Sequence, residues 1–120
     1  MNIYISCIPY YIISMVEDKD IFELHAGICK TLANPIRLRI LSELQQGECT
    51  VNSLSNNLNV RQANISQHLS VLRHRGVVSI RKDGPNVYYK ISNPKITKAC
   101  NLMREVLIEY IQKNSQLIGN

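Results

Sequence analysis

Residues 61–68 bring together six polar side chains that can form directional hydrogen bonds: Arg61, Gln62, Asn64, Ser66, Gln67 and His68. Planar amide and guanidinium groups can bond a flat partner at two points at once. Base edges in the DNA major groove offer such paired groups: Gln and Asn match adenine, Arg matches guanine, and Ser matches either. The cluster therefore favours hydrogen-bonded recognition of bases. Each residue taken singly has an alternative interpretation without DNA. Most would be ordinary polar surface residues, Ser66 would cap a helix or bond within it, and His68 would pack against the preceding helix and donate to a carbonyl.

Bond-making chemistry has no comparable set of residues in the sequence. No nucleophile lies beside a base, no glycine-rich loop could cradle a phosphate, and no carboxylate pair is placed for acid–base work. The sequence predicts that the protein is not an enzyme.

The cluster lies on the second of two short predicted helices, which cover about residues 50–58 and 62–74. Thr50 can cap the first helix, and Asn59 and Val60 form a tight turn between them. Ile65, Leu69 and Leu72 recur at helical spacing, so one face of the second helix is expected in a core. This arrangement predicts a helix-turn-helix, whose second helix enters the major groove. Arg73, near the end of that helix, is expected to contact a phosphate.

The period of the sequence changes from helical to two at "VVSIRKDGPNVYYKI". This pattern predicts a β-hairpin with residues 83–86 at its tip. The hairpin would place Arg81, Lys82 and Asn86 beside the DNA backbone or minor groove. The fold class is therefore mainly α with a small β-hairpin, a winged helix-turn-helix.

Basic residues concentrate in the same part of the chain. Residues 61–98 contain eight Lys or Arg and one acidic residue, whereas the rest contains six basic and eight acidic residues. A basic block beside a mildly acidic remainder indicates a surface for a polyanion, with an ordinary solvated face as the alternative.

Three further helices are predicted, over about residues 17–32, 34–46 and 94–112. The first and last are amphipathic, and the last is longer than so small a core needs. The predicted domains are an N-terminal arm at residues 1–16, the winged helix-turn-helix at 17–113, and a C-terminal tail at 114–120. No apolar run approaches the roughly 20 residues that span a bilayer, so no membrane partner is expected. The cysteines are far apart and do not resemble a secreted disulfide framework, so free thiols in the cytoplasm are expected.

The segments "LANPIRLRILSEL", "ISQHLSVLRHRGVV" and "RKDGPNVYYKI" closely resemble the ArsR/SmtB family of transcriptional repressors. The resemblance covers about residues 20–112. It implies a homodimer joined through the first and last helices, which binds a double-stranded DNA operator and releases it when an inducer binds. Here that inducer is an unidentified signal.

The resemblance weakens at the inducer sites. The positions that hold thiolate ligands in some metal-sensing members are Thr50 and Asn52 here. Other members use Asp, His, His and Glu or His on the last helix, and the matching positions here are Asn93, Lys95, Val106 and Glu109, of which only Glu109 could bind a metal. Both sites therefore look absent, and no cofactor is expected to be required.

A sensor built on cysteines is the alternative function. Cys29, Cys49 and Cys100 could form an unusual site for a soft metal ion, a metalloid or an oxidant. Cys49 lies near a helix start, where a thiol pKa can fall, so it is expected to be the most reactive. Cys29 and Cys100 lie on apolar helix stripes, which favours burial as small hydrophobic residues. A winged-helix module that binds only proteins is a further alternative, which the basic block disfavours.

Overall fold

The computed structural model describes residues 20–115 of the chain. The chain divides into two compact units, residues 1–34 and residues 35–120. The predicted arm at residues 1–16 and the last five residues of the predicted tail lie outside the described residues.

The first unit contributes one described helix, α3 (Ile21–Leu32). Its N-cap is Asp20, which has a positive φ of 55° and whose carboxylate accepts a hydrogen bond from the Phe22 amide at 3.0 Å. Asp20 was expected inside the first turn. It instead precedes the helix, because a capping carboxylate must lie outside the helix to reach the free amides. Residues 17–19, which were also predicted to be helical, lie outside the described residues.

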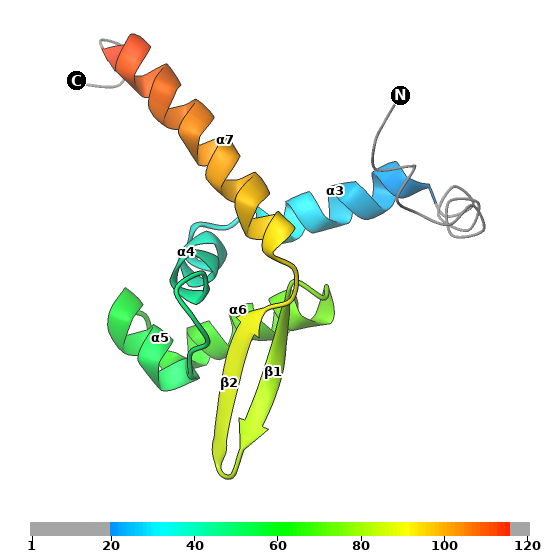
Figure 1. Cartoon of the computed structure of the whole chain (residues 1–120), viewed down its shortest axis with the longest axis vertical. Coiled ribbons are helices and arrows are strands. Elements are labelled where there is room, and N and C mark those ends of the chain that lie inside the picture. Colours follow the sequence, from blue (N-terminus) through cyan, green and yellow to red (C-terminus); the bar gives the residue numbers. More distant parts are fainter. Residues whose placement is uncertain (1–19, 116–120) are drawn as a thin grey trace. The chain divides into compact units, whose positions relative to one another are not determined.

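The second unit contains α4 (Pro35–Leu44), α5 (Val51–Leu58) and α6 (Gln62–His74), followed by a hairpin and α7 (Pro94–Lys113), as Figure 1 shows. Its core is built from α4, α5, α6 and the start of the hairpin. The fully or almost fully buried apolar side chains are Ile40, Leu41, Leu44, Leu54, Ile65, Leu69, Leu72, Val77 and Val78.

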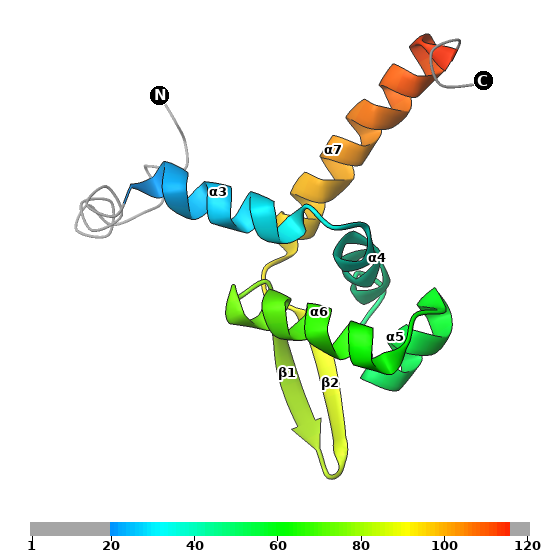
Figure 2. The same cartoon turned by 180° about the vertical axis from the view of Figure 1, so that it is seen from behind.

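The turn between α5 and α6 is held at both ends of α5. The Thr50 hydroxyl accepts a hydrogen bond from the Ser53 amide at 3.1 Å and so caps the helix start. At the other end Asn59 adopts the left-handed conformation, with φ 55° and ψ 48°, which asparagine tolerates better than most residues. The Ser55 hydroxyl then donates to the Val60 carbonyl at 2.5 Å. These contacts aim the chain directly into α6, which Figure 2 shows from the other side.

The hairpin, called the wing below, pairs β1 (Val78–Asp83) with β2 (Asn86–Ile91) in antiparallel register. Asp83 faces Asn86, and Gly84 takes a positive φ of 59° in the two-residue turn. A positive φ suits glycine because it lacks a Cβ. The predicted hairpin and its tip are confirmed.

The loop between α4 and α5 attaches to the free edge of β2. Cys49 and Tyr89 exchange two backbone hydrogen bonds: the Cys49 amide donates to the Tyr89 carbonyl at 3.0 Å, and the Tyr89 amide donates to the Cys49 carbonyl at 2.8 Å. The wing is thus joined to the helical part of the unit along β2 as well as through the chain.

Helix α7 leaves the core with most of its apolar residues exposed. Asn93 caps its start through the Lys95 amide at 2.9 Å, and Pro94 occupies its first turn. Gln45, just after α4, and Asn101 on α7 exchange two amide hydrogen bonds, of 3.2 and 3.0 Å. Beyond that contact, seven large apolar side chains are 43–64% exposed: Leu102, Met103, Val106, Leu107, Ile108, Tyr110 and Ile111.

Within the described residues the chain is mainly helical, with five helices and one antiparallel hairpin. The predicted fold class is confirmed. None of the helices in residues 20–115 has the length and apolar content needed to cross a bilayer.

Candidate nucleic-acid interface

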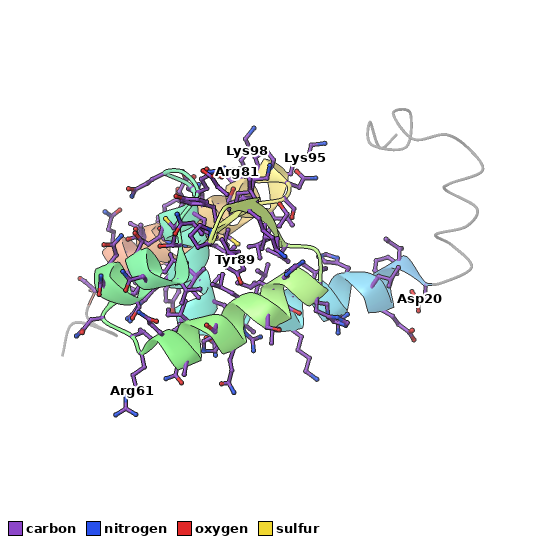
Figure 3. All side chains as sticks on the ribbon, turned by 90° about the horizontal axis from the view of Figure 1, so that it is seen from below. Asp20, Arg61, Arg81, Tyr89, Lys95 and Lys98 are labelled. Carbon is purple, nitrogen blue, oxygen red and sulfur yellow. The ribbon has the colours of Figure 1, made fainter. Side chains whose placement is uncertain are left out.

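Helix α6 is divided sharply into a buried apolar face and an exposed polar face. Ile65, Leu69 and Leu72 are completely buried. The predicted base-contacting residues lie outside the core: Arg61, Gln62, Asn64, Ser66 and Gln67 are exposed, and His68 is half-buried. Arg61 extends away from the ribbon at the start of the helix (Figure 3). The helix therefore offers a continuous row of hydrogen-bonding groups while its position is fixed by the core.

Arg73 is exposed in the last turn of α6, where the sequence predicted a phosphate contact. Positive charge is favourable at a helix C-terminus because of the helix dipole. The same side chain can thus stabilise the helix end and remain available to a polyanion.

Gln62 is held by a residue on α5. Its Nε2 donates a hydrogen bond to the Asn52 Oδ1 at 2.8 Å. This bond fixes the plane of the Gln62 amide and leaves its carbonyl oxygen and second N–H to face outward. Since bidentate adenine recognition uses one acceptor and one donor, a fixed amide plane is what such a contact needs.

His68 is held by a residue on α4. Its Nδ1 accepts a hydrogen bond from the Arg37 Nε at 3.1 Å. Burial of the ring, together with the positive charge of Arg37, lowers the pKa of His68 below its usual value. Because Nδ1 accepts from Arg37, the proton of the neutral ring lies on Nε2. The sequence suggested that this ring would donate to a carbonyl, whereas here it accepts from a guanidinium.

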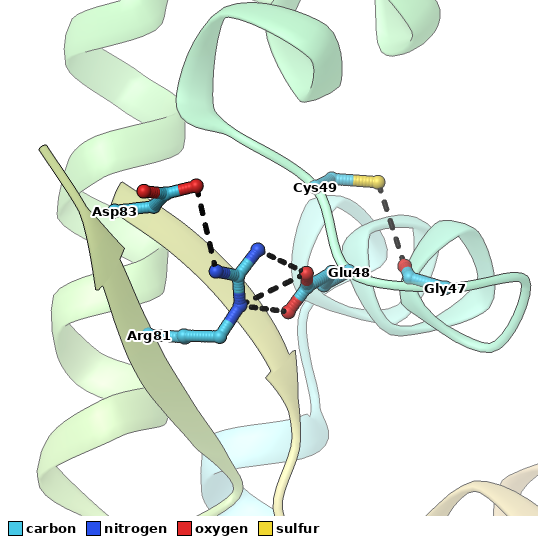
Figure 4. Close-up of polar contacts among 5 residues, drawn as sticks. All are labelled: Gly47, Glu48, Cys49, Arg81 and Asp83. Carbon is cyan, nitrogen blue, oxygen red and sulfur yellow. Dashed lines mark hydrogen bonds and ion pairs between the residues drawn. The ribbon is translucent and has the colours of Figure 1, made fainter. Parts of the chain in front are cut away.

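The wing residue Arg81 is engaged within the chain. Its Nε lies 3.1 Å from both carboxylate oxygens of Glu48, and its Nη2 lies 2.5 Å from one of them (Figure 4). Nη1 lies 3.9 Å from the Asp83 carboxylate, and the guanidinium carbon is 4.5 Å from the centre of the Tyr88 ring. The hydrogen bond from Arg81 lowers the pKa of Glu48.

Lys82 and Asn86, the other predicted wing contacts, are exposed. Within residues 20–115, Lys82 takes part in no ion pair, in contrast to its neighbour Arg81. Its charge is therefore available to an external anion.

Three supporting residues were missed by the sequence prediction: Arg37, Glu48 and Asn52. Each lies on a different element from the residue it holds, at separations of 31, 33 and 10 residues. Periodicity finds which face a residue occupies but not which distant side chain it meets. Of the three, only Asn52 had been singled out in the sequence, because it occupies a position where metal-sensing members of the family place a ligand.

The cysteines differ from what their positions suggested. Cys29 is exposed rather than buried, and Cys100 is half-buried. Burial raises the pKa of Cys49, and the negative charge of Glu43 raises it further. The prediction that the pKa of this thiol falls because it lies near a helix start is therefore wrong. Its Sγ instead lies 3.6 Å from the Gly47 carbonyl oxygen.

Three of the positions where metal-sensing members place metal ligands have structural roles in this chain. Thr50 and Asn93 cap helices, and Asn52 holds Gln62. Among residues 20–115, no three His, Cys, Asp or Glu side chains come close enough together to bind a metal ion.

Comparison with known proteins agrees with this geometry. The family model for the bacterial regulatory protein, arsR family, matches residues 34–79, which include α4, α5 and α6. The uncharacterized HTH-type transcriptional regulator Rv0081 of Mycobacterium tuberculosis is 39% identical over 93 residues, or 77% of this chain and 82% of that protein. The chain belongs to the ArsR family. This ArsR-family protein is a DNA-binding transcriptional regulator and not an enzyme.

Two further relatives of this ArsR-family chain act on transcription in opposite directions, one as an activator and one as a repressor. The transcriptional activator HlyU of Vibrio cholerae is 36% identical and covers 72% of this chain and 78% of its own. The transcriptional repressor PagR of Bacillus anthracis is 33% identical and covers 68% and 82%, respectively.

Solved structures show the same fold. The crystal structure of Rv0081 superposes with a TM-score of 0.72 at 35% identity, over 80% of this chain and 97% of that one. The homodimeric winged helix-turn-helix DNA-binding domain of Mb0332 from Mycobacterium bovis gives a TM-score of 0.73 at 28% identity, over 81% and 90%.

Proposed function

We propose that this ArsR-family regulator is a homodimeric repressor that binds a pseudo-palindromic operator, with α6 of each protomer in a major groove. The observation that carries the proposal is the division of α6: Ile65, Leu69 and Leu72 are fully buried, whereas the predicted base-contacting side chains lie outside the core. A helix fixed by its core presents these groups without the entropic cost of ordering them on contact. Arg61, Gln62, Asn64, Ser66, Gln67 and His68 supply the base contacts, and Arg73, Lys82 and Asn86 contact the backbone.

The exposed apolar stripe of α7 supports the homodimer. Seven large apolar side chains on one 20-residue helix exceed what a protein surface usually leaves uncovered in one place. The homodimeric winged helix-turn-helix domain of Mb0332, which has this fold, also supports a homodimer. In our proposal the first and last helices pair between protomers. Two protomers related by a two-fold axis would recognise two half-sites.

Selection from a random duplex library tests operator binding directly. The expected outcome is an inverted repeat whose half-site centres are separated by one helical turn or a multiple of it. Gln67→Ala should then reduce discrimination against random DNA by about 1–3 kcal/mol per contact. An equal loss on operator and random duplexes would remove Gln67 from the base contacts, and no association at low salt would end the proposal.

Transcription in vitro from a promoter that contains the selected site determines the sign of regulation. A repressor lowers transcript yield when it covers the polymerase site. We favour repression because the family resemblance and PagR agree on it, whereas a rise in transcript would give the activator role described for HlyU.

Operator binding by the protein alone requires no cofactor in this proposal. The positions where metal-sensing relatives place ligands cap helices or hold Gln62 here, which supports this view. Protein dialysed against a chelator should therefore bind the operator with unchanged affinity. We place the regulator in the cytoplasm, together with its DNA.

Release by a thiol-directed signal is the second candidate function. The exposed thiol of Cys29 favours it, because an accessible thiol can reach an oxidant or a soft ion. Titration of the protein–DNA complex with zinc, cadmium, arsenite and a polysulfide tests it, with Cys29→Ser, Cys49→Ser and Cys100→Ser as matched variants. If no agent weakens DNA binding, the signal is not read by a thiol.

A further inference from the structure

We propose that Arg81 is a positioning residue that locks the wing to the α4–α5 loop, and that the phosphate contact on β1 belongs to its neighbour Lys82. The inference rests on the proposed DNA binding, and it reassigns one residue that the sequence placed against DNA.

The sheet register explains how Arg81 reaches Glu48. Cross-strand partners share a face, so Arg81 on β1 lies on the same face as Tyr88 on β2. Cys49 pairs with Tyr89 at the other edge of β2. Glu48, one residue before Cys49, therefore lies on the face of Tyr88, because successive residues of an extended chain alternate between faces.

The Arg81 side chain consequently crosses β2 over the Tyr88 ring and ends on the Glu48 carboxylate. The guanidinium carbon lies 4.5 Å from the ring centre, and Nε and Nη2 both contact Glu48 (Figure 4). Arg81 thus ties β1 to the loop on the far edge of β2. The tie lies beside the Cys49–Tyr89 backbone pair, and together they fix the angle at which the wing leaves the core.

The local charges argue against a phosphate contact by Arg81. Its single positive charge faces two carboxylates, Glu48 at hydrogen-bond distance and Asp83 at 3.9 Å. A DNA phosphate would have to displace a bidentate carboxylate and approach a second negative charge. Lys82 points to the opposite face of the hairpin, since it pairs with Val87, and within residues 20–115 it has no ion pair.

The chemistry of arginine separates the two roles. To hold the wing, Arg81 needs its planar guanidinium group, which bonds the Glu48 carboxylate at two points and stacks on the Tyr88 ring. A phosphate contact needs mainly the positive charge. Arg81→Lys should therefore behave like Arg81→Gln if Arg81 is a lock, and like the unmodified protein if it contacts phosphate.

The test measures operator affinity against salt for Glu48→Gln, Arg81→Gln, Arg81→Lys and the matched control Lys82→Gln. Each of the first three should weaken binding by about 1.5- to fivefold, which is the range for exposed ion pairs, with an unchanged salt slope. Combining Glu48→Gln with Arg81→Gln should cost no more than either alone. Lys82→Gln should reduce the salt slope by about one for each wing on DNA.

Three results would overturn the proposal. A salt slope reduced by Arg81→Gln as much as by Lys82→Gln would make Arg81 a phosphate contact. Tighter binding by Glu48→Gln would mean that Glu48 competes with DNA for Arg81. Full operator affinity in both Glu48→Gln and Arg81→Gln would show that the wing needs no such lock.

Hydrogen exchange on the protein alone keeps the lock distinct from the DNA-binding proposal. The amides of Cys49 and Tyr89 should exchange faster in Glu48→Gln and Arg81→Gln and at the normal rate in Lys82→Gln. Unchanged exchange in all three variants would refute the lock, whereas failure to bind any duplex would refute only the proposed function.

Discussion

Helices α6 and α7 have similar amphipathic patterns and opposite fates. On α6 the apolar residues Ile65, Leu69 and Leu72 are completely buried within the protomer, and the polar residues face outward. On α7 the apolar residues remain exposed, with Leu102 at 62% and Met103 at 64%. The same periodicity thus marks two kinds of surface: an apolar face that is buried within the chain, and an apolar face that is left exposed and that the proposed dimer would cover.

Leu69→Ala on α6 should have the largest effect on stability. Removing a fully buried leucine leaves a cavity, which costs about 2–5 kcal/mol in the free energy of unfolding. Urea unfolding followed by circular dichroism measures it. A loss below about 1 kcal/mol would mean that α6 is not fixed by the core, and the comparison with α7 would fail.

Leu107→Glu on α7 should separate the protomers without unfolding them. Leu107 is 54% exposed, so the protomer loses little, whereas a dimer would bury a charge at two symmetric positions. The dimer dissociation constant should rise by roughly a hundredfold or more, as measured by sedimentation. The exposed residue Glu105 gives the control Glu105→Gln on the same helix. An unchanged oligomeric state would mean that α7 is not the interface.

Asn52→Ala should weaken base discrimination by α6 while leaving its fold intact. Loss of the 2.8 Å bond frees the Gln62 amide to rotate, so the expected cost is about 0.5–1.5 kcal/mol at one base pair. Operator affinity measured across single-base variants checks the prediction.

The variant Asn52→Asp is the matched control for that experiment. It keeps an oxygen that accepts from Gln62 and should retain the discrimination. Loss in Asn52→Asp together with retention in Asn52→Ala would contradict a role of Asn52 in orienting Gln62.

His68 lies at the border between the two faces of α6, and its protonation should have the smallest effect on the free energy of unfolding. Burial and Arg37 lower the pKa of His68, so the unfolded chain takes up a proton first as pH falls through the usual histidine value of about 6.5. The contribution of His68 to the free energy of unfolding is therefore fully present above that pH and declines below it, until the folded protein is protonated as well.

Urea midpoints at pH 7.5, 6.5 and 5.5 measure this decline. His68→Asn retains an acceptor for Arg37 but cannot be protonated in this range, so its midpoint should change less with pH. Equal pH dependence in both proteins would assign the decline to other groups.

The helices, the hairpin and the polar surface of α6 follow from local features of the sequence. The buried stripe of α6, the Thr50 cap, the turn at Asn59 and the hairpin tip at Asp83–Asn86 all depend on neighbours within a few residues. Local hydrogen bonding and periodicity decide such features, so they can be predicted without a structure.

Tertiary structure alone decided which side chains support that surface. The Arg37–His68, Asn52–Gln62 and Glu48–Arg81 contacts join different elements, and the exposure of Cys29 and the raised pKa of Cys49 depend on their surroundings. Periodicity assigns a residue to one face of its helix or strand. It does not show which side chains on other elements lie close to that face. The sequence predicts a DNA contact for Arg81, and only the folded chain shows that its guanidinium contacts the Glu48 carboxylate.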